Sequence, residues 1–139
     1  MSARAFIAAS LLILNARAVG AVESADWPTY LGDRANSHYS AIKQINTRNV
    51  NKLQIAWTYS AGGARPDGRS QIQCNPLIID GVLYGTSPQS VLFALDAATG
   101  KELWRFNPLR GGGDHQALGV NRGVVYWADG DDQRFLYSA

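Results

Sequence analysis

The sequence predicts an all-β chain of the β-propeller class, and three features support this prediction. Short apolar runs recur along residues 72–137, and turns rich in glycine and aspartate separate them. The pattern Gly-Val-x-Tyr occurs at Gly81–Tyr84 and again 42 residues later at Gly123–Tyr126. A Trp-x-aromatic pattern also occurs twice, at Trp57–Tyr59 and Trp104–Phe106. A period of about 40–45 residues, with about four short strands in each repeat, is typical of propeller blades.

The alternative is chance similarity between short β segments, which draw on few residue types. The 42-residue offset also aligns Phe93 with Phe135 and Leu95 with Tyr137 without gaps, which favours a true repeat. At this period, 139 residues hold one full blade and the start of the next. Because propellers need at least four blades to close, we expect an incomplete propeller that is the N-terminal part of a longer protein.

The first 21 residues are expected to be a secretory signal peptide. Arg4 supplies a positive start, Ala5–Leu14 is almost entirely apolar, and small residues end at Ala21, where cleavage is expected. The apolar run is short for a membrane span, although an uncleaved anchor is the alternative. Cleavage would remove Arg4 and Arg17 and leave 11 basic residues against 11 acidic ones. This balance argues against a nucleic-acid-binding surface.

The remaining residues divide into two regions. Residues 22–60 are expected to hold an opening segment, largely loop with a short helix near Thr47–Leu53, and the first propeller strand. Residues 61–139 are expected to form the partial propeller. The predicted strands of its full blade are Ile72–Ile79, Val82–Thr86, Val91–Leu95 and Leu103–Phe106.

The segment Asp96–Trp104 predicts a tight turn between two of these strands. Asp96 can accept hydrogen bonds from the turn amides, and Gly100 can adopt a positive φ without steric cost. Trp104 is expected to pack its indole against a neighbouring sheet. Cys74, the single cysteine, is expected to be a small buried side chain near a strand start.

Four landmarks follow one another between residues 26 and 137. They are the opening Trp27-Pro28-x-Tyr30-x-Gly32-Asp33 continued to Trp57-x-Tyr59, then Asn75–Tyr84, Phe93–Trp104 and Arg122-Gly123-Val124-x-Tyr126-Trp127. This ordered set resembles the quinoprotein dehydrogenases, which are the pyrroloquinoline quinone (PQQ) alcohol and glucose dehydrogenases. The Phe93–Trp104 turn alone is less specific, because non-catalytic propellers also carry it.

The resemblance implies an eight-bladed propeller with PQQ and a calcium ion on its axis. The whole protein would oxidise an alcohol, sugar or polyol and pass electrons to ubiquinone or a cytochrome c. It would be periplasmic, and association with the inner membrane is left open. The resemblance places the catalytic base and the calcium ligands beyond Ala139, so this chain is assigned no catalytic or metal residue and is expected to be inactive alone.

Two residues match cofactor positions of the family. Arg122 matches an arginine that meets PQQ carboxylates, and its alternative role is that of a surface arginine in a hairpin turn. Gln73 matches a position that is glutamate in the methanol branch and glutamine in the glucose branch, and its alternative is an ordinary polar strand residue. Residues 114–120 lack the adjacent cysteines of the alcohol branch, which favours the sugar or polyol branch.

Weaker candidates are expected to have no special chemistry. Asp129–Asp132 is expected to be a solvated turn rather than a calcium loop, because it lacks spaced ligands. His115 and His38 are expected to be loop histidines, although His115 could lie near a substrate. Gly111–Gly113 is expected to be a connector, because no phosphate-binding motif follows it.

Two classes of function remain. The first is a periplasmic PQQ-dependent oxidoreductase, and the second is a non-catalytic PQQ-like propeller that acts as a scaffold or assembly protein of the cell envelope. The opening from Trp27 to Trp57 favours the oxidoreductase, because scaffold propellers carry the Phe93–Trp104 turn without that opening.

Overall fold

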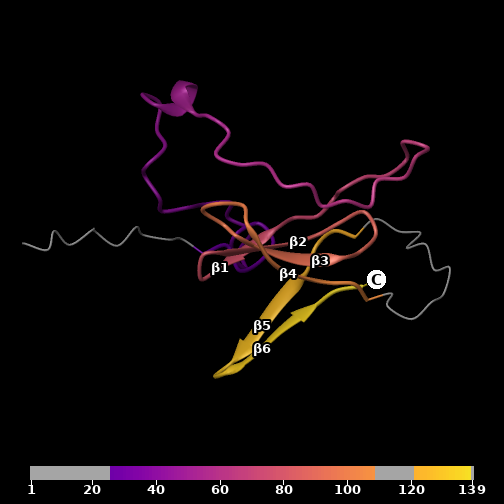
Figure 1. Cartoon of the computed structure of the whole chain (residues 1–139). Coiled ribbons are helices and arrows are strands. Elements are labelled where there is room, and N and C mark those ends of the chain that lie inside the picture. The colour runs from indigo at the N-terminus through magenta and orange to yellow at the C-terminus, as the bar shows by residue number, and fades with distance from the viewer. Residues whose placement is uncertain (1–25, 109–120, 139) are drawn as a thin grey trace, which may run out of the picture.

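The computed structural model describes residues 26–108 and 121–138, and the prediction of an all-β chain is confirmed there (Figure 1). These residues form two antiparallel sheets and one short 3-10 helix. The elements are η1 (Val50–Lys52), β1 (Leu77–Ile79), β2 (Val82–Thr86), β3 (Leu92–Asp96), β4 (Glu102–Phe106), β5 (Val125–Asp129) and β6 (Asp132–Leu136). None of the helices in the described ranges is long and apolar enough to cross a membrane.

The first sheet is a four-stranded meander in the order β1-β2-β3-β4, as expected of one blade. The predicted bounds of β2 are confirmed, and those of β3 and β4 differ by one residue. The predicted start of β1 at Ile72 was wrong, because the strand begins at Leu77. Pro76 has no N–H to donate, and Asn75 instead pairs with Gly123 outside this sheet.

The second sheet is the hairpin β5-β6, and it corrects the predicted repeat. Ile79 pairs with Val82 across a two-residue turn, and Asp129 pairs with Asp132 across a turn of the same length. The hairpin β5-β6 therefore corresponds to β1-β2, at an offset of 50 residues between Ile79 and Asp129. The 42-residue offset was misled by the short Gly-Val pattern, which precedes β2 in one case and β5 in the other.

The core lies between the first sheet and the second hairpin. Leu77, Ile79 and Leu92 of the sheet form one buried cluster with Val124, which directly precedes β5. The aromatic residues packed against this cluster are Tyr84, Tyr126, Phe135 and Tyr137. The rings of Tyr84 and Phe135 are 4.2 Å apart between centroids, so β2 and β6 contact each other face to face. Burial of one blade's face by the next is how propellers gain most of their stability.

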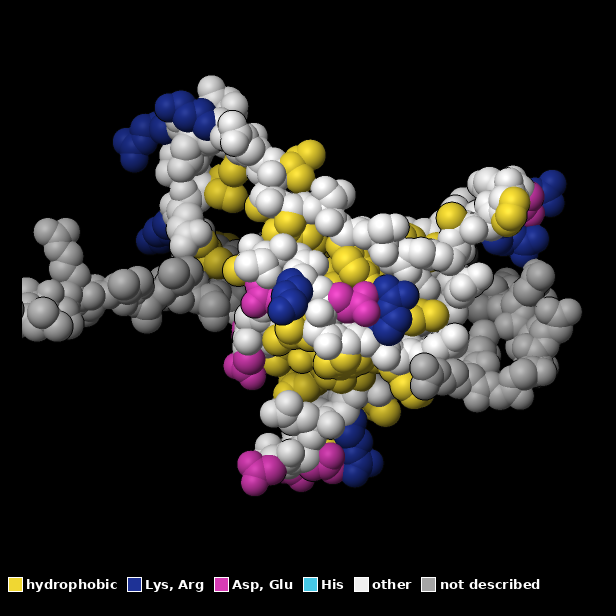
Figure 2. All heavy atoms as spheres, in the orientation of Figure 1, with side chains coloured by type: hydrophobic (Ala, Val, Ile, Leu, Met, Phe, Trp, Pro, Cys, Tyr) yellow, Lys and Arg dark blue, Asp and Glu magenta, His cyan; other side chains and the backbone are white. Residues whose placement is uncertain are grey.

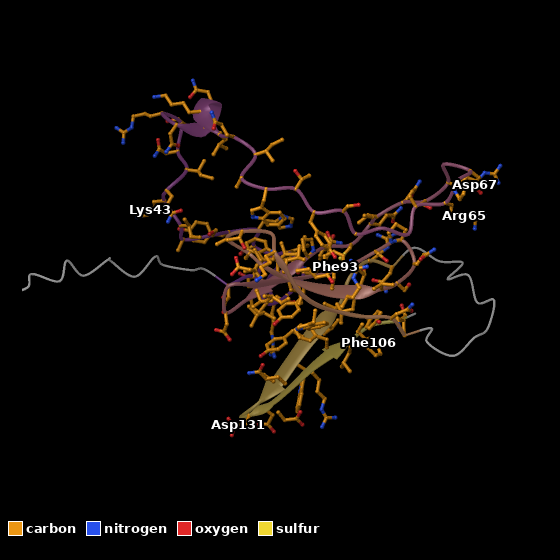
Figure 3. All side chains as sticks on the ribbon, viewed as in Figure 1. Lys43, Arg65, Asp67, Phe93, Phe106 and Asp131 are labelled. Atoms are coloured by element: carbon orange, nitrogen blue, oxygen red, sulfur yellow. The ribbon has the colours of Figure 1, made fainter. Side chains whose placement is uncertain are left out.

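The opposite face of the first sheet is covered by the opening segment. The Trp57 indole lies over the backbone of Gly100, and its Nε1 donates to the carbonyl oxygen of Ala97 at 3.1 Å. Tyr59 packs on Phe93, which is near the centre of Figure 3, with ring centroids 5.0 Å apart. The expectation that Trp104 would pack on a neighbouring sheet is not met in the described residues. Its side chain is 42% exposed and contacts Tyr84 of its own sheet.

The rest of the opening segment stands away from the sheets (Figure 1). Trp27 pairs with Ile78 and so covers the outer edge of β1, with N···O distances of 2.7 and 3.1 Å. From there the chain extends to η1, whose position confirms the expected short helix, and returns at Trp57. Ile45 and Leu53 flank η1 and are 57% and 58% exposed, so this part of the segment has no apolar partner among the described residues.

The predicted turn after β3 is confirmed in detail. The Asp96 carboxylate accepts hydrogen bonds from the Thr99 hydroxyl at 2.7 Å and the Thr99 amide at 2.8 Å. These bonds, the hydroxyl bond first, hold the pKa of Asp96 below its ordinary value of 3.8. Gly100 has a φ of +72° and donates its amide to the Asp96 carbonyl.

This lowered pKa predicts a pH dependence of stability. The stabilising contribution of Asp96 should be complete above 3.8, the ordinary pKa of the carboxyl, and should be lost as the pH falls through the lower pKa of the folded state. Thr99→Val, which removes the hydroxyl bond, should therefore destabilise the protein less in acid than at neutral pH. Urea denaturation of both proteins at the two pH values measures this, and an equal difference at both would contradict it.

Candidate functional site

The two candidate cofactor residues, Arg122 and Gln73, lie on neighbouring chain segments. Gln73 precedes β1 and Arg122 precedes β5, and the two segments run parallel through a bridge between Asn75 and Gly123. The amide N–H of Asn75 donates to the Arg122 carbonyl at 3.0 Å, and the Asn75 Nδ2 donates to the same oxygen at 3.2 Å. The site therefore lies where the starts of two corresponding strands meet.

The Arg122 side chain is exposed, and its guanidinium has no hydrogen bond or ion pair within residues 26–108 and 121–138. Its backbone, in contrast, is fixed by Asn75 and Gly123. The alternative of a hairpin-turn arginine does not fit, since the hairpin turn of this sheet is at Gly130–Asp131. A held backbone with an unpaired guanidinium suits a ligand that carries carboxylates.

Gln73 is also exposed, and its Nε2 donates to Oε1 of Gln71 at 2.8 Å. One donor hydrogen and the acceptor oxygen of its amide therefore stay free for a ligand. The two residues offer positive charge and neutral polar groups without any carboxylate. This donor set fits a flat, multiply carboxylated group such as the PQQ that the resemblance implies.

Gly123 is required where the two segments meet. Its φ is +121°, and a Cβ atom placed on it would lie 2.8 Å from the carbonyl oxygen of Asn75. Both atoms belong to backbone, so rotation of a side chain could not relieve the contact. The close approach of the two segments therefore depends on glycine at this position.

Asn121 is a residue of this site that sequence reasoning missed. Its Oδ1 accepts from the Thr86 hydroxyl at 3.0 Å and from the Gly123 amide at 2.7 Å. Its Nδ2 donates to the carbonyl oxygen of Ser138 at 2.5 Å. Thr86 and Ser138 are 35 and 17 residues away in the sequence, so no local pattern could have indicated these contacts.

A second polar cluster lies on the other face of the first sheet and contains no candidate residue. The Tyr59 hydroxyl donates to Glu102 at 2.5 Å, and Arg105 Nη2 donates to that hydroxyl at 2.6 Å and to Glu102 at 2.7 Å. The hydrogen bond from Arg105, followed by that from Tyr59, lowers the pKa of Glu102. Burial, followed by the bond to Glu102, raises the pKa of Tyr59. The charges are mutually satisfied, so this cluster joins the opening segment to β4.

The weaker candidates are placed as follows. Asp131 lies at the exposed tip of the β5-β6 hairpin, so the solvated turn is confirmed (Figure 3). His38 is an exposed loop residue, whereas His115 and Gly111–Gly113 lie outside the described residues. Cys74 is half-buried rather than buried, because its Sγ accepts a hydrogen bond from the Thr86 amide. No group of three metal-binding side chains occurs in the part of the chain that the structure describes.

A family model supports the resemblance over nearly all of the described chain. The model of the PQQ glucose/ethanol/alcohol dehydrogenase β-propeller domain matches residues 27–139. This range includes the opening segment, both sheets and the segments that carry Gln73 and Arg122.

Individual relatives agree with the family model. Quinoprotein glucose dehydrogenase A of Acinetobacter calcoaceticus is 38% identical over 128 residues, which are 89% of this chain and 16% of the relative. The dehydrogenase subunit of the alcohol dehydrogenase (quinone) of Gluconobacter oxydans is 41% identical over 105 residues, 73% of this chain and 13% of the relative. The crystal structure of quinohemoprotein alcohol dehydrogenase from Comamonas testosteroni matches with a TM-score of 0.62 and 33% identity, covering 78% of this chain and 16% of that one. The chain thus spans about one sixth or less of the length of these relatives.

Proposed function

The chain belongs to the family of PQQ glucose, ethanol and alcohol dehydrogenases with a β-propeller domain, and from this premise we propose that it is the N-terminal part of a PQQ-dependent dehydrogenase. The complete protein would oxidise an alcohol, a sugar or a polyol. The observation that carries the proposal is the unpaired Arg122 guanidinium, held on a fixed backbone beside the segment of Gln73.

Within this proposal, the chain's own residues bind and orient the cofactor. Arg122 would bind a carboxylate of PQQ through two parallel N–H donors, and Gln73 would add neutral hydrogen bonds without repelling the anion. Bound PQQ would supply the two-electron oxidant for the substrate. Calcium, which the family resemblance also implies, is expected to be held by residues outside this chain.

The partners follow from the relatives and are proposals for this protein. Printed names of relatives include a glucose dehydrogenase and a 1-butanol dehydrogenase (cytochrome c). We propose an alcohol or a sugar as substrate, and ubiquinone or a cytochrome c as electron acceptor. Dye reduction by the complete protein with a panel of alcohols and aldoses would identify the substrate class. No turnover with any of them, despite bound PQQ, would favour the scaffold propeller instead.

The sharpest test of this function is Arg122→Ala in the complete protein. Loss of a charge-assisted contact to an anion should weaken PQQ binding by about 2–4 kcal/mol, or about 30- to 1000-fold. Arg122→Lys should recover only part of this loss, because an ammonium cannot present two parallel donors. Titration of the apo-protein with PQQ in excess calcium measures the affinity.

The matched control for this test is Arg48→Ala. Arg48 is also exposed, but it lies beside η1, away from the β5-β6 hairpin (Figure 1). The control should bind PQQ like the wild type. If Arg122→Ala and Arg122→Lys also did so, the assignment of the cofactor site would be wrong.

We propose further that the protein is exported to the periplasm. The basis is the charged start, apolar run and small-residue end of residues 1–21. Cleavage after Ala21 should give a mature protein that begins Val22-Glu23-Ser24. Mass spectrometry of the purified protein checks this, and retention of Met1–Ala21 would instead favour a membrane anchor.

A further inference from the structure

Asn121 holds the chain on the N-terminal side of Arg122. Its side chain joins three segments: the end of β2 at Thr86, the backbone of Gly123, and the end of the hairpin at Ser138. On the C-terminal side, the pairing of Asn75 with Gly123 holds the backbone, and Asn75 also binds the Arg122 carbonyl. Arg122 is therefore fixed on both sides while its own side chain remains exposed.

We propose that Asn121 is a positioning residue that sets the direction in which Arg122 presents its guanidinium to the cofactor. This inference rests on the proposed function and adds to it a residue that does not itself touch the cofactor. The Asn121 amide is half-buried and bonded to the protein, whereas the Arg122 side chain faces solvent. A guanidinium on a mobile backbone would lose conformational entropy on binding, so a fixed backbone raises affinity.

The chemistry of the Asn121 partners explains why an amide suits this position. Thr86 is only 1% exposed, so its hydroxyl needs an internal partner, which Asn121 Oδ1 provides. The same oxygen accepts from an amide N–H, while Nδ2 donates to a carbonyl. A carboxylate could accept the first two bonds but could not donate the third, and it would place a negative charge next to Arg122.

The test is a double-mutant cycle in the complete apo-protein, titrated with PQQ in excess calcium. Asn121→Ala should weaken PQQ binding about 10-fold. In the Arg122→Ala background, the same change should weaken binding by less than about 2-fold, because there is no guanidinium left to position. A purely structural role would give the same loss in both backgrounds, and that result would overturn the proposal.

Two further variants keep the test decisive. Asn49→Ala is the matched control, because Asn49 also makes two side-chain hydrogen bonds, at 2.7 and 2.8 Å, but beside η1. It should leave PQQ affinity unchanged. If Asn121→Ala fails to fold, Thr86→Val removes one of the three bonds with little change of shape and should weaken binding about 3-fold.

The outcomes separate this inference from the function on which it rests. Wild-type affinity in both Asn121→Ala and Thr86→Val, with a large loss in Arg122→Ala, would overturn the positioning role and leave the cofactor site standing. Wild-type affinity in Arg122→Ala would overturn both.

Discussion

Gly100→Ala is expected to lower the free energy of unfolding by about 3–5 kcal/mol. The new Cβ would lie 2.5 Å from ring atoms of Trp57, so the indole must move off the turn. Overpacking of this kind costs about 1–3 kcal/mol. The positive φ of +72° adds strain of about 1 kcal/mol for alanine, and loss of the Trp57 bond to the Ala97 carbonyl costs about 1 kcal/mol more.

Gly81→Ala is the matched control for this prediction. Gly81 has nearly the same φ, +74°, in the turn between β1 and β2, but nothing lies within 4 Å of its added Cβ. It should show the backbone strain alone, about 1 kcal/mol. Urea denaturation of the complete protein compares the two variants. Equal destabilisation would mean that Trp57 does not pack on this turn.

The second large effect is expected for Gly123→Ala, which should lower the free energy of unfolding by about 3–5 kcal/mol and abolish tight PQQ binding. A φ of +121° strains any residue with a Cβ by about 1–3 kcal/mol. The Cβ would also lie 2.8 Å from the Asn75 carbonyl oxygen, which can move only if the whole segment moves. The bridge between the two segments would open, and Arg122 would lose its backbone partner.

The control for Gly123 lies in the same hairpin. Gly130 has a φ of +57° and open space around an added Cβ, so Gly130→Ala should cost about 1 kcal/mol and leave PQQ affinity unchanged. Denaturation and PQQ titration are both needed for this pair. Normal PQQ binding by Gly123→Ala would show that the contact of the two segments does not shape the cofactor site.

Local patterns were sufficient to predict most of the first blade. The alternation of β2 and the turn chemistry of Asp96 and Gly100 depend on neighbours within a few residues, and both predictions are confirmed. The start of β1 was wrong because Pro76 ends the strand pairing there, and Asn75 pairs instead with a residue of a different sheet. A pairing partner 48 positions away leaves no signal in the local sequence.

The same limit applies to the tryptophans and to the site. The sequence indicated two similar aromatic segments, at Trp57 and Trp104, but not that Trp57 would cover the turn that leads into β4. The family resemblance located Arg122 and Gln73, whereas Asn121 was missed because its partners come from the ends of β2 and β6. Contacts between distant segments define this site, and only the folded chain brings them together.

The bridge between Asn75 and Gly123 also has a consequence for the order of folding. The hairpins β1-β2 and β5-β6 close through two-residue turns, so they can form within microseconds. The bridge joins residues 48 positions apart, and closing so long a loop costs more chain entropy before any contact compensates for it. Arg122 therefore acquires its final orientation late, after both hairpins exist, and a newly made chain should become able to bind PQQ only in its last folding phase.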